Sequence, residues 1–296
     1  MNILVTGADG QLGRELNKAF AGQYNNKDSR DEYFFCNKNQ LDITRKDLVS
    51  NFISQNKIDI VINAGAFTRV DDAESDSDLA MDINYLGVQN IVSALEDRNG
   101  LIIQISTDYV FSGENTVPYP EDAAKKPLSV YGKSKLMGEE CIQNSSINYL
   151  IIRTSWLYSA FGKNFFTTIY NKIINNNHLK VVNDQFGAPT YAKDLAIFIK
   201  YLLKNIEFGI HEVIHFSNTG ETTWYDFSVE IGKLSNKEFS IQPISSQLLN
   251  LPAPRPKYAV LSLDKCIKLT QFKIDSWEAA CKRCYQDMFT ERDLNK

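Results

Sequence analysis

The sequence predicts an α/β protein built on a doubly wound parallel sheet, with a second, smaller mixed α/β domain. Three observations predict this class. Short β-branched runs alternate with longer amphipathic segments through the first half of the chain. These runs are apolar almost throughout, as expected for strands covered by helices on both faces. A glycine-rich turn joins the first strand pattern to the first helical pattern, and the crossover rule then favours a doubly wound arrangement.

The alternation places the elements of the first domain in order. We expect five strands, at Ile3–Thr6, Tyr33–Cys36, Asp59–Asn63, Leu101–Ser106 and Tyr149–Thr154. Four helices are expected between them, at Gln11–Ala21, Arg45–Gln55, Leu79–Asp97 and Val130–Gln143. After residue 155 the alternation weakens and Asn, Gly and Pro become more frequent. We therefore predict a first domain at residues 1–154 and a second at 155–296, with 179–205 returning to the first.

The composition indicates a class of protein and excludes some kinds of binding partner. The chain has 296 residues, 43% of them hydrophobic and 23% charged, which is typical of a globular protein. Its net charge of −4, without a basic cluster, gives no electrostatic footprint for nucleic acid, and its apolar runs are too short to cross a membrane. Five scattered cysteines favour a reducing compartment. Because the N-terminus reads directly into a strand, we expect no signal peptide and a cytoplasmic location.

The turn after the first strand has the composition of a dinucleotide-binding loop. In Gly7-Ala-Asp-Gly10-Gln-Leu-Gly13, the first glycine permits a tight turn and the second lets backbone approach a pyrophosphate. The third allows the helix to pack close to the sheet, and the helix N-terminus presents free N–H groups to the phosphates. The first domain is thus predicted to be a Rossmann-type, NAD(P)-binding domain.

The end of the second strand bears on cofactor choice. An acidic residue that grips the adenosine ribose is common there, but this chain has Cys36-Asn-Lys38, and the first acid is Asp42. A lysine tolerates a 2′-phosphate that a carboxylate would oppose. The pattern favours NADPH slightly, or use of both NADPH and NADH.

A phenol, an ammonium and a hydroxyl form the predicted catalytic group. Tyr131 and Lys135 lie four residues apart, on one face of the helix after Pro127. The lysine cation and an oxidised nicotinamide would both favour the phenolate and pull the pKa of Tyr131 toward working pH. Thr107 ends the fourth strand, where its hydroxyl could hold a substrate carbonyl beside Tyr131. This arrangement indicates proton donation to a carbonyl as hydride arrives, with Lys135 also holding the nicotinamide ribose.

Two further motifs do not fit the chemistry that they superficially suggest. His211-Glu-Val-Ile-His215 spells a zinc-protease motif, but the segment reads as a strand, in which the two imidazoles would lie roughly 13 Å apart. We expect no metal site. Cys281-Lys-Arg-Cys284 lies on a C-terminal helical pattern rather than at a strand–helix junction, so packed or free thiols are expected.

The chain resembles the extended short-chain dehydrogenase/reductases, and among them the dTDP-4-dehydrorhamnose reductases, over essentially its whole length. The segments that carry the resemblance are Gly7–Gly13, Leu41–Thr44, Asn63–Thr68, Val70–Glu74, Ser106–Phe111, Tyr131–Glu139, Arg153–Tyr158, Gly162–Phe165, Asp184–Thr190, Ser217–Tyr225 and Arg255-Pro256. The resemblance implies reduction of the 4-keto group of dTDP-4-dehydro-L-rhamnose to dTDP-L-rhamnose by NAD(P)H, with a second domain that binds the dTDP-activated 4-keto-6-deoxy sugar. A homodimer is also possible.

The resemblance implies individual contacts as well. Cofactor contacts fall to Gly10, Gln11, Leu12, Asp42, Ile43, Ala66 and Thr68. Substrate contacts fall to Thr107, Asp108, Tyr131 and Trp156. Arg255, in the proline-stiffened loop 252–256, could pair with the diphosphate. Trp156 could stack on the sugar or base, or serve as an aromatic residue between domains. Asn84, in the third helix, could brace the active-site backbone or be an ordinary polar helix residue.

Two alternatives to this function stay open. The same triad serves other nucleotide-sugar reductases and epimerases, and the same fold can form a non-catalytic regulatory subunit. The intact triad, with Trp156 and Asp184–Thr190, argues against the second alternative.

Overall fold

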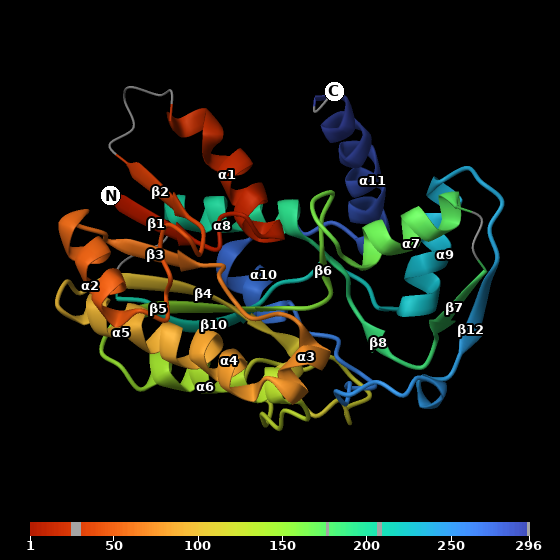
Figure 1. Cartoon of the computed structure of the whole chain (residues 1–296), viewed down its shortest axis with the longest axis horizontal. Coiled ribbons are helices and arrows are strands. Elements are labelled where there is room, and N and C mark those ends of the chain that lie inside the picture. The colour runs from red at the N-terminus through yellow and green to blue at the C-terminus, as the bar shows by residue number, and fades with distance from the viewer. Residues whose placement is uncertain (25–30, 176–177, 206–208, 295–296) are drawn as a thin grey trace.

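A computed structural model describes residues 1–24, 31–175, 178–205 and 209–294. It contains a six-stranded parallel sheet in the order β10-β5-β4-β3-β1-β2, with a smaller lobe beside it (Figure 1). The strands are β1 (Asn2–Thr6), β2 (Glu32–Cys36), β3 (Ile60–Asn63), β4 (Leu101–Thr107), β5 (Asn148–Thr154) and β10 (His211–His215). The predicted α/β class is confirmed. The strand order reverses between β1 and β3, and ligands of such sheets bind outside the carboxyl ends at this point.

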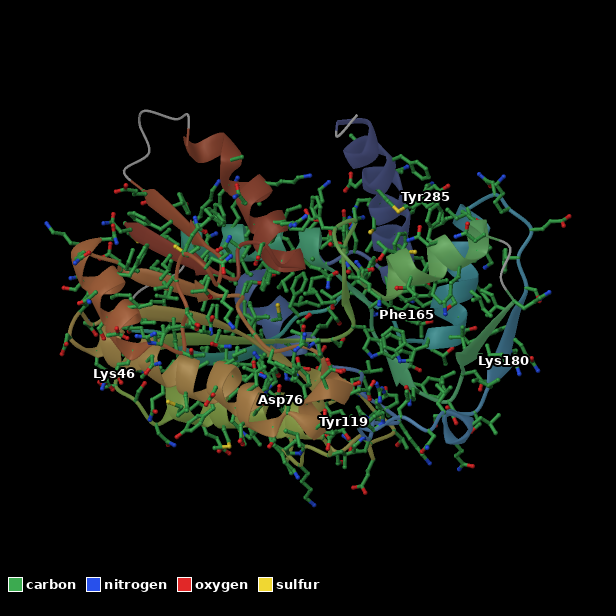
Figure 2. The ribbon with its side chains drawn as sticks, in the orientation of Figure 1. Lys46, Asp76, Tyr119, Phe165, Lys180 and Tyr285 are labelled. Atoms are coloured by element: carbon green, nitrogen blue, oxygen red, sulfur yellow. The ribbon has the colours of Figure 1, made fainter. Side chains whose placement is uncertain are left out.

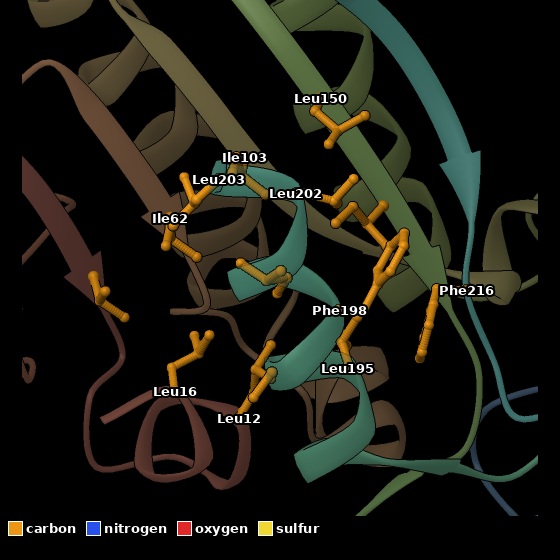
Figure 3. Packing of buried hydrophobic residues seen from close by; sticks show 14 of the residues in the cluster. Leu12, Leu16, Ile62, Ile103, Leu150, Leu195, Phe198, Leu202, Leu203 and Phe216 are labelled. Carbon is orange, nitrogen blue, oxygen red and sulfur yellow. The ribbon is translucent and has the colours of Figure 1, made fainter. Parts of the chain in front are cut away.

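Helices cover both faces of the sheet (Figure 1). On one face lie α1 (Gln11–Tyr24) and α8 (Ala192–Asn205), which pack against each other. On the other lie α2 (Lys46–Gln55), α5 (Gly87–Glu96) and α6 (Val130–Gln143). Figure 3 shows the first of these two cores, where Leu16 of α1 and Phe198 of α8 approach Ile62 and Ile103 of the sheet; all four side chains are fully buried. This burial on both faces explains why the strands read as continuous apolar runs.

The helix predicted over 79–97 is divided. It consists of α4 (Ser77–Met81), one π-helical turn (Asp82–Leu86) and α5, and a short α3 (Val70–Ser75) precedes it. A π turn commonly marks a functional position within a helix. Here it carries Asn84, whose side chain is 2% exposed and faces α6.

The second lobe has its own core and three short pairs of strands. Its helices are α7 (Phe165–Ile174), α9 (Trp224–Leu234) and α11 (Trp277–Leu294). Its strand pairs join β6 (Leu157–Tyr158) with β9 (Thr190–Tyr191), β8 (Phe186–Gly187) with β11 (Thr222–Thr223), and β7 (Leu179–Val182) with β12 (Ile241–Ile244). Buried aromatic and aliphatic side chains of these elements form one cluster, which includes Tyr158, Phe166, Phe227 and Trp277. None of the described helices is both long and apolar enough to span a bilayer.

The chain passes between the lobes more often than a single boundary at residue 154 implies. Within 179–205, β7 pairs with β12 in the second lobe, whereas α8 packs on the large sheet. Strand β10 lies within the predicted second domain, yet it extends the large sheet by pairing in parallel with β5. The short helix α10 (Asp264–Thr270) also returns, and its Cys266 joins the core beneath α8. The open edge of β5 accounts for the return of β10, because an unpaired edge strand leaves its backbone groups unsatisfied.

Candidate active site

A cavity of about 820 Å³ lies at the carboxyl ends of the sheet strands, between the two lobes. From the sheet side it is lined by the turn after β1, the ends of β3 and β4, and the start of α6. From the second lobe it is lined by residues of α7, β7, the start of α9 and the loop near residue 250. Phe165, at the start of α7, lies where the two lobes meet (Figure 2). A cleft at a strand-order reversal is the expected ligand site of this fold.

The glycine turn has the geometry predicted for it. Gly7 has a φ of +66°, which favours glycine, and its carbonyl accepts the N–H of Gly10 at 3.0 Å. A Cβ on Gly13 would lie 2.2 Å from the carbonyl oxygen of Gly7, so only glycine lets α1 pack this close to the turn. Gly10, Gln11 and Leu12 line the cavity, as do Ala66 and Thr68 from the loop after β3.

Other predicted cofactor residues lie outside this cavity. Asp42 and Ile43 follow β2 in the chain and do not line it. The Asp42 carboxylate accepts hydrogen bonds from the N–H and the hydroxyl of Thr44, at 3.0 and 2.8 Å. Ile43 is buried against α5, where a Cβ on Gly87 would clash with it. Their contacts with a cofactor stay a prediction.

Tyr131 is placed by the N-terminus of α6. The hydroxyl of Ser129 caps this helix by accepting the Gly132 N–H at 3.1 Å, and the Glu74 carboxylate of α3 accepts the Val130 N–H at 2.8 Å. The Tyr131 ring packs edge-on against Tyr109, with centroids 5.6 Å apart. The phenol thus enters the cavity from a helix end that two side chains hold in place.

Lys135 lies one turn further along α6 and is 4% exposed. Its Nζ donates a hydrogen bond to the carbonyl oxygen of Ile105 in β4, at 2.6 Å. Burial lowers the pKa of Lys135 to about 8, and the nearby carboxylate of Glu139 opposes this shift. The ammonium is therefore fixed at the end of β4, two residues before Thr107.

The pKa of Tyr131 is above the usual value for a tyrosine. Burial raises it to about 12, a hydrogen bond with the Thr107 side chain opposes the rise, and Asp108 adds to it. The expected lowering depends on a bound, oxidised nicotinamide as well as on Lys135, and it stays a prediction; here the Lys135 ammonium is directed to the Ile105 carbonyl, and burial has the largest effect on the Tyr131 pKa. Tyr131 is consequently a neutral phenol, which is the protonation state that a proton donor needs. Thr107 and Tyr131 both line the cavity.

Two buried acceptor atoms that line the cavity lack a partner among the described residues, Gln11 Oε1 and Asp108 Oδ2. The other Asp108 oxygen accepts the Thr107 hydroxyl at 2.9 Å. Burial raises the pKa of Asp108 to about 7. Buried polar atoms are normally hydrogen-bonded, so these two acceptors fit a site that a ligand with hydrogen-bond donors completes.

Asn84 braces the wall of the cavity. Its Oδ1 accepts the Phe67 N–H at 2.9 Å, and its Nδ2 donates to the Phe67 carbonyl at 3.0 Å and to the Ser134 hydroxyl at 2.9 Å. It therefore joins the loop that carries Ala66 and Thr68 to the helix that carries Tyr131. Of the two roles considered for Asn84, this geometry favours the bracing of active-site backbone.

Trp156 stands between the lobes and lines the cavity. Its indole stacks on that of Trp224, with ring centroids 3.5 Å apart and planes at 8°. Gly187 also packs against it, since a Cβ there would lie 2.4 Å from Cε2. Trp156 has a φ of +46°, a conformation that is rare for a bulky residue and is found at functional sites. One face of the indole is thus already covered, and a sugar or base would meet the Trp156–Trp224 pair rather than a lone ring.

Arg255 lines the cavity but is not a free cation. Its guanidinium forms a bidentate ion pair with Asp71 of α3, with Nη2 at 2.7 Å from Oδ2 and Nη1 at 3.0 Å from Oδ1. Nη1 also donates to the carbonyl of Ala253, at 2.8 Å. The loop of the second lobe is therefore tied to the first lobe beside the cavity. Asp71 lies in the segment Val70–Glu74 that carries the resemblance, but no role was predicted for it from the sequence.

Comparison with known proteins identifies the family. The family model described as the RmlD substrate binding domain matches residues 1–290. The chain belongs to this family. The resemblance noted in the sequence is thereby confirmed.

Relatives of the family match the chain over nearly its whole length. The spore coat polysaccharide biosynthesis protein SpsK of Bacillus subtilis is 37% identical over 287 residues, which cover 96% of this chain and 97% of that protein. The crystal structure of a dTDP-4-dehydrorhamnose reductase from Clostridium acetobutylicum is 37% identical, with a TM-score of 0.90 over 98% of this chain and 100% of that one. That of the Bacillus anthracis dTDP-4-dehydrorhamnose reductase in complex with NADP is 33% identical, with a TM-score of 0.88 over 97% and 99%.

The segment that spells a zinc-protease motif and the Cys281–Cys284 pair both have ordinary structural roles. Residues 211–215 form strand β10, as predicted, and His211 Nε2 lies 3.1 Å from the carbonyl of Ile147. His215 is fully buried beside Arg153, and burial lowers its pKa to about 3. Cys281 and Cys284 are buried free thiols of α11, also as predicted. No cluster of three metal-binding side chains occurs among the residues that the structure describes.

Most of the residues that line the cavity from the second lobe were not predicted from the sequence. Phe165, Thr168, Lys172, Lys180, Trp224, Leu249 and Leu251 line the cavity without having been predicted to do so. Lys180 is on β7 in the second lobe (Figure 2). Phe165 and Trp224 lie in segments that carried the resemblance, and this was the available signal. The lysines have no local pattern that distinguishes them from exposed lysines elsewhere.

Proposed function

We propose that the chain reduces the 4-keto group of dTDP-4-dehydro-L-rhamnose to give dTDP-L-rhamnose, using NADPH or NADH. The observation that carries the proposal is the meeting of Thr107, Tyr131 and Lys135 at the end of β4, in the same cavity as Gly10 and Gln11. The enzyme class is an NAD(P)H-dependent oxidoreductase, as predicted from the sequence. The two reductase structures that match the whole chain support both the class and the substrate.

The residues suit the proton half of the reaction. Reduction of a ketone adds a hydride to carbon and a proton to oxygen. Tyr131 holds a proton at any ordinary pH because its pKa is about 12, and the Thr107 hydroxyl beside it would share the substrate oxygen. As the carbonyl oxygen gains negative charge its basicity rises, so the Tyr131 proton moves to it only when the hydride arrives.

The cofactor site fits a dinucleotide. The turn has glycine at positions 7, 10 and 13, so no side chain at these three positions hinders a pyrophosphate, and Gln11 Oε1 lacks a protein partner among the described residues. Bound there, the nicotinamide supplies the hydride. Lys135 would hold the ribose and, once the phenol has given up its proton, stabilise the phenolate. The slight preference for NADPH rests on Lys38 after β2, and the relative bound to NADP supports it.

The second lobe would bind the sugar nucleotide. Asp108 and the Trp156–Trp224 pair lie on the cavity wall, where a deoxy sugar or a pyrimidine could pack on the indoles. Residues 155–296, apart from the segments that return to the sheet, are thus proposed as the substrate-binding part. The predicted homodimer stays a prediction.

The test measures the oxidation of NADPH and of NADH in the presence of enzymatically generated dTDP-4-dehydro-L-rhamnose. The loss of cofactor absorbance reports the rate. Wild type should turn over and form dTDP-L-rhamnose, with the C4 configuration determined by NMR. Tyr131→Phe should lose turnover by about three orders of magnitude or more while binding cofactor normally. A product with the other C4 configuration would assign a different nucleotide-sugar reductase. Equal, zero turnover of both proteins on all keto sugars tried would favour the regulatory subunit.

A further inference from the structure

The loop that closes the cavity from the second lobe is anchored at both ends by carboxylates. At its start, Asp184 accepts the Ser246 N–H at 2.8 Å and the Ser245 hydroxyl at 2.8 Å. At its end, Asp71 accepts the Ala253 N–H at 3.2 Å and holds the guanidinium of Arg255. Asp184 belongs to the second lobe, whereas Asp71 belongs to α3 of the first. Only the second anchor therefore crosses between the lobes.

The ion pair leaves part of the guanidinium available. Arginine has five N–H donors. Two of them meet the Asp71 carboxylate and one meets the Ala253 carbonyl. The Nε–H and the second Nη2–H have no partner among the residues that the structure describes. The side chain of Arg255 is 19% exposed and lines the cavity, so these two donors can meet an anion there in the forked geometry that arginine offers to phosphate.

Arg255 also lies one side chain away from the reaction centre. Tyr109 lines the cavity together with Arg255, and the Tyr109 ring packs on that of Tyr131. Helix α3 also links Arg255 to Tyr131. At one end it carries Asp71, which pairs with Arg255, and at the other it carries Glu74, which accepts a hydrogen bond at the start of the helix that bears Tyr131. In a 4-keto nucleotide sugar, the diphosphate is attached to the same ring that reacts at C4. Arg255 and Tyr131 line the same cavity, so the cation of Arg255 can meet that diphosphate while Tyr131 faces the reacting end of the sugar.

We propose that Asp71 is a positioning residue for the sugar-nucleotide diphosphate: it holds Arg255 by two donors so that the remaining two meet the phosphates. This inference rests on the proposed function. Asp71 would act through Arg255. It would not touch the substrate itself, because a carboxylate beside the anionic diphosphate would oppose binding.

The direction in which diphosphate affinity changes when Asp71 is neutralised separates two roles for Asp71, the positioning of Arg255 and competition for it. If Asp71 only competed with the substrate for Arg255, its neutralisation would release the cation and strengthen diphosphate binding. If it positions Arg255, neutralisation frees the long side chain to other rotamers and weakens binding. Asp71→Asn preserves the shape but replaces one acceptor oxygen with an amide donor, and the bidentate pair is lost.

The experiment measures the affinities of the full chain for dTDP, thymidine and NADPH by calorimetry. In Asp71→Asn, dTDP should bind about tenfold or more weakly, as expected for a lost charged hydrogen bond, with thymidine and NADPH unchanged. Asp78→Asn is the control, because Asp78 is an exposed carboxylate of the next helix, α4, and does not line the cavity; it should bind all three ligands as wild type does. Asp71→Asn combined with Arg255→Ala should bind dTDP no more weakly than Arg255→Ala alone.

Several outcomes would overturn the proposal. The first is dTDP binding by Asp71→Asn that is unchanged or tighter. The second is a loss of thymidine affinity equal to the loss of dTDP affinity. The third is a double variant that binds dTDP more weakly than Arg255→Ala does. If Asp71→Asn folds poorly, Arg255→Lys gives the same test, since lysine keeps the charge but not the fork; dTDP affinity equal to wild type would then overturn it. UDP and uridine are titrated in parallel. Preference for UDP would reject the dTDP assignment of the proposed function, and the role of Asp71 would be judged on the UDP–uridine pair.

Discussion

Arg153 and Glu139 form a fully buried ion pair, with Nη2 2.7 Å from Oε2 and Nε 3.0 Å from Oε1. The carboxylate also accepts the Ser106 hydroxyl at 2.5 Å, and the guanidinium donates to the Glu121 carbonyl at 2.9 Å. Glu139 is one helical turn beyond Lys135 and raises its pKa against the effect of burial. The pair thus joins β4, β5 and α6 directly behind the proposed catalytic residues.

Glu139→Gln should cost about 3–5 kcal/mol of unfolding free energy, because it leaves the buried Arg153 charge without its carboxylate. Urea denaturation measures this loss. Glu140→Gln, at the exposed neighbouring position of α6, is the control and should change stability by less than about 0.5 kcal/mol. Equal stability of the two variants would show that the ion pair does not hold the three elements together.

The pH dependence of turnover should report Lys135. Burial lowers its pKa to about 8, so the ammonium loses its proton above that pH. The descending limb of kcat/KM should lie near pH 8, because this parameter reports groups of the free enzyme, whereas Tyr131 would titrate only near 12. Lys133→Gln, at an exposed position of the same helix, should leave the limb in place. A profile with no descending limb would contradict the role of the ammonium.

Asp108 should make folding stability fall as pH rises. Its pKa is raised from 3.8 to about 7, so the folded protein binds this proton more tightly than the unfolded chain does. Stability is therefore lost through the window between these two values and stays low above it. Asp108→Asn should remove that loss and exceed wild type by about 1–3 kcal/mol at about pH 8, with a smaller difference near pH 4. Denaturation at the two pH values provides the check, and a difference independent of pH would exclude this explanation.

Gly13→Ala and Gly10→Ala should separate folding from cofactor binding. A Cβ at Gly13 would meet the backbone of Gly7 and Ala8 at 2.2 and 2.7 Å, so the turn must shift at a cost of about 1–3 kcal/mol. At Gly10 the nearest such contact is 3.2 Å, so the protein should remain almost as stable. The added methyl would still oppose the pyrophosphate, and NADPH affinity should fall about tenfold or more, or about 1.4 kcal/mol. Thermal unfolding and NADPH titration of both variants distinguish the two effects; normal NADPH binding by Gly10→Ala would place the pyrophosphate elsewhere.

The sequence predicted the first lobe well because its determinants are local. Strand runs, the glycine turn and the Tyr131–Lys135 spacing each depend on neighbouring residues, and the structure contains all three. The π turn at 82–86 was not predictable in this way, since it depends on packing against α6, where a Cβ on Gly138 would clash with the Asn84 carbonyl. The raised pKa of Tyr131 likewise follows from burial, which spacing alone does not reveal.

Long-range pairing explains what the sequence did not predict. Asp71 and Arg255 are separated by 184 positions, and neither has a local pattern that names the other. Trp156 directly precedes β6 and Trp224 begins α9, and the stacking of the two indoles depends on how these elements of the second lobe meet in the folded chain. The return of β10 was missed for a similar reason, since its partner is the edge of β5 and its sequence would fit either lobe.

The placement of β10 and α8 has a consequence for any attempt to divide this protein. A fragment ending at residue 154 would contain all five strands that were predicted from the sequence. It would, however, leave one side of the β5 backbone unpaired, and it would expose the apolar surface that Phe198 and its neighbours cover. Such an edge is a template for association with other chains. We therefore expect the fragment to aggregate when it is expressed alone, and a nascent chain to need the residues through β10, which ends at His215, before its first half becomes soluble.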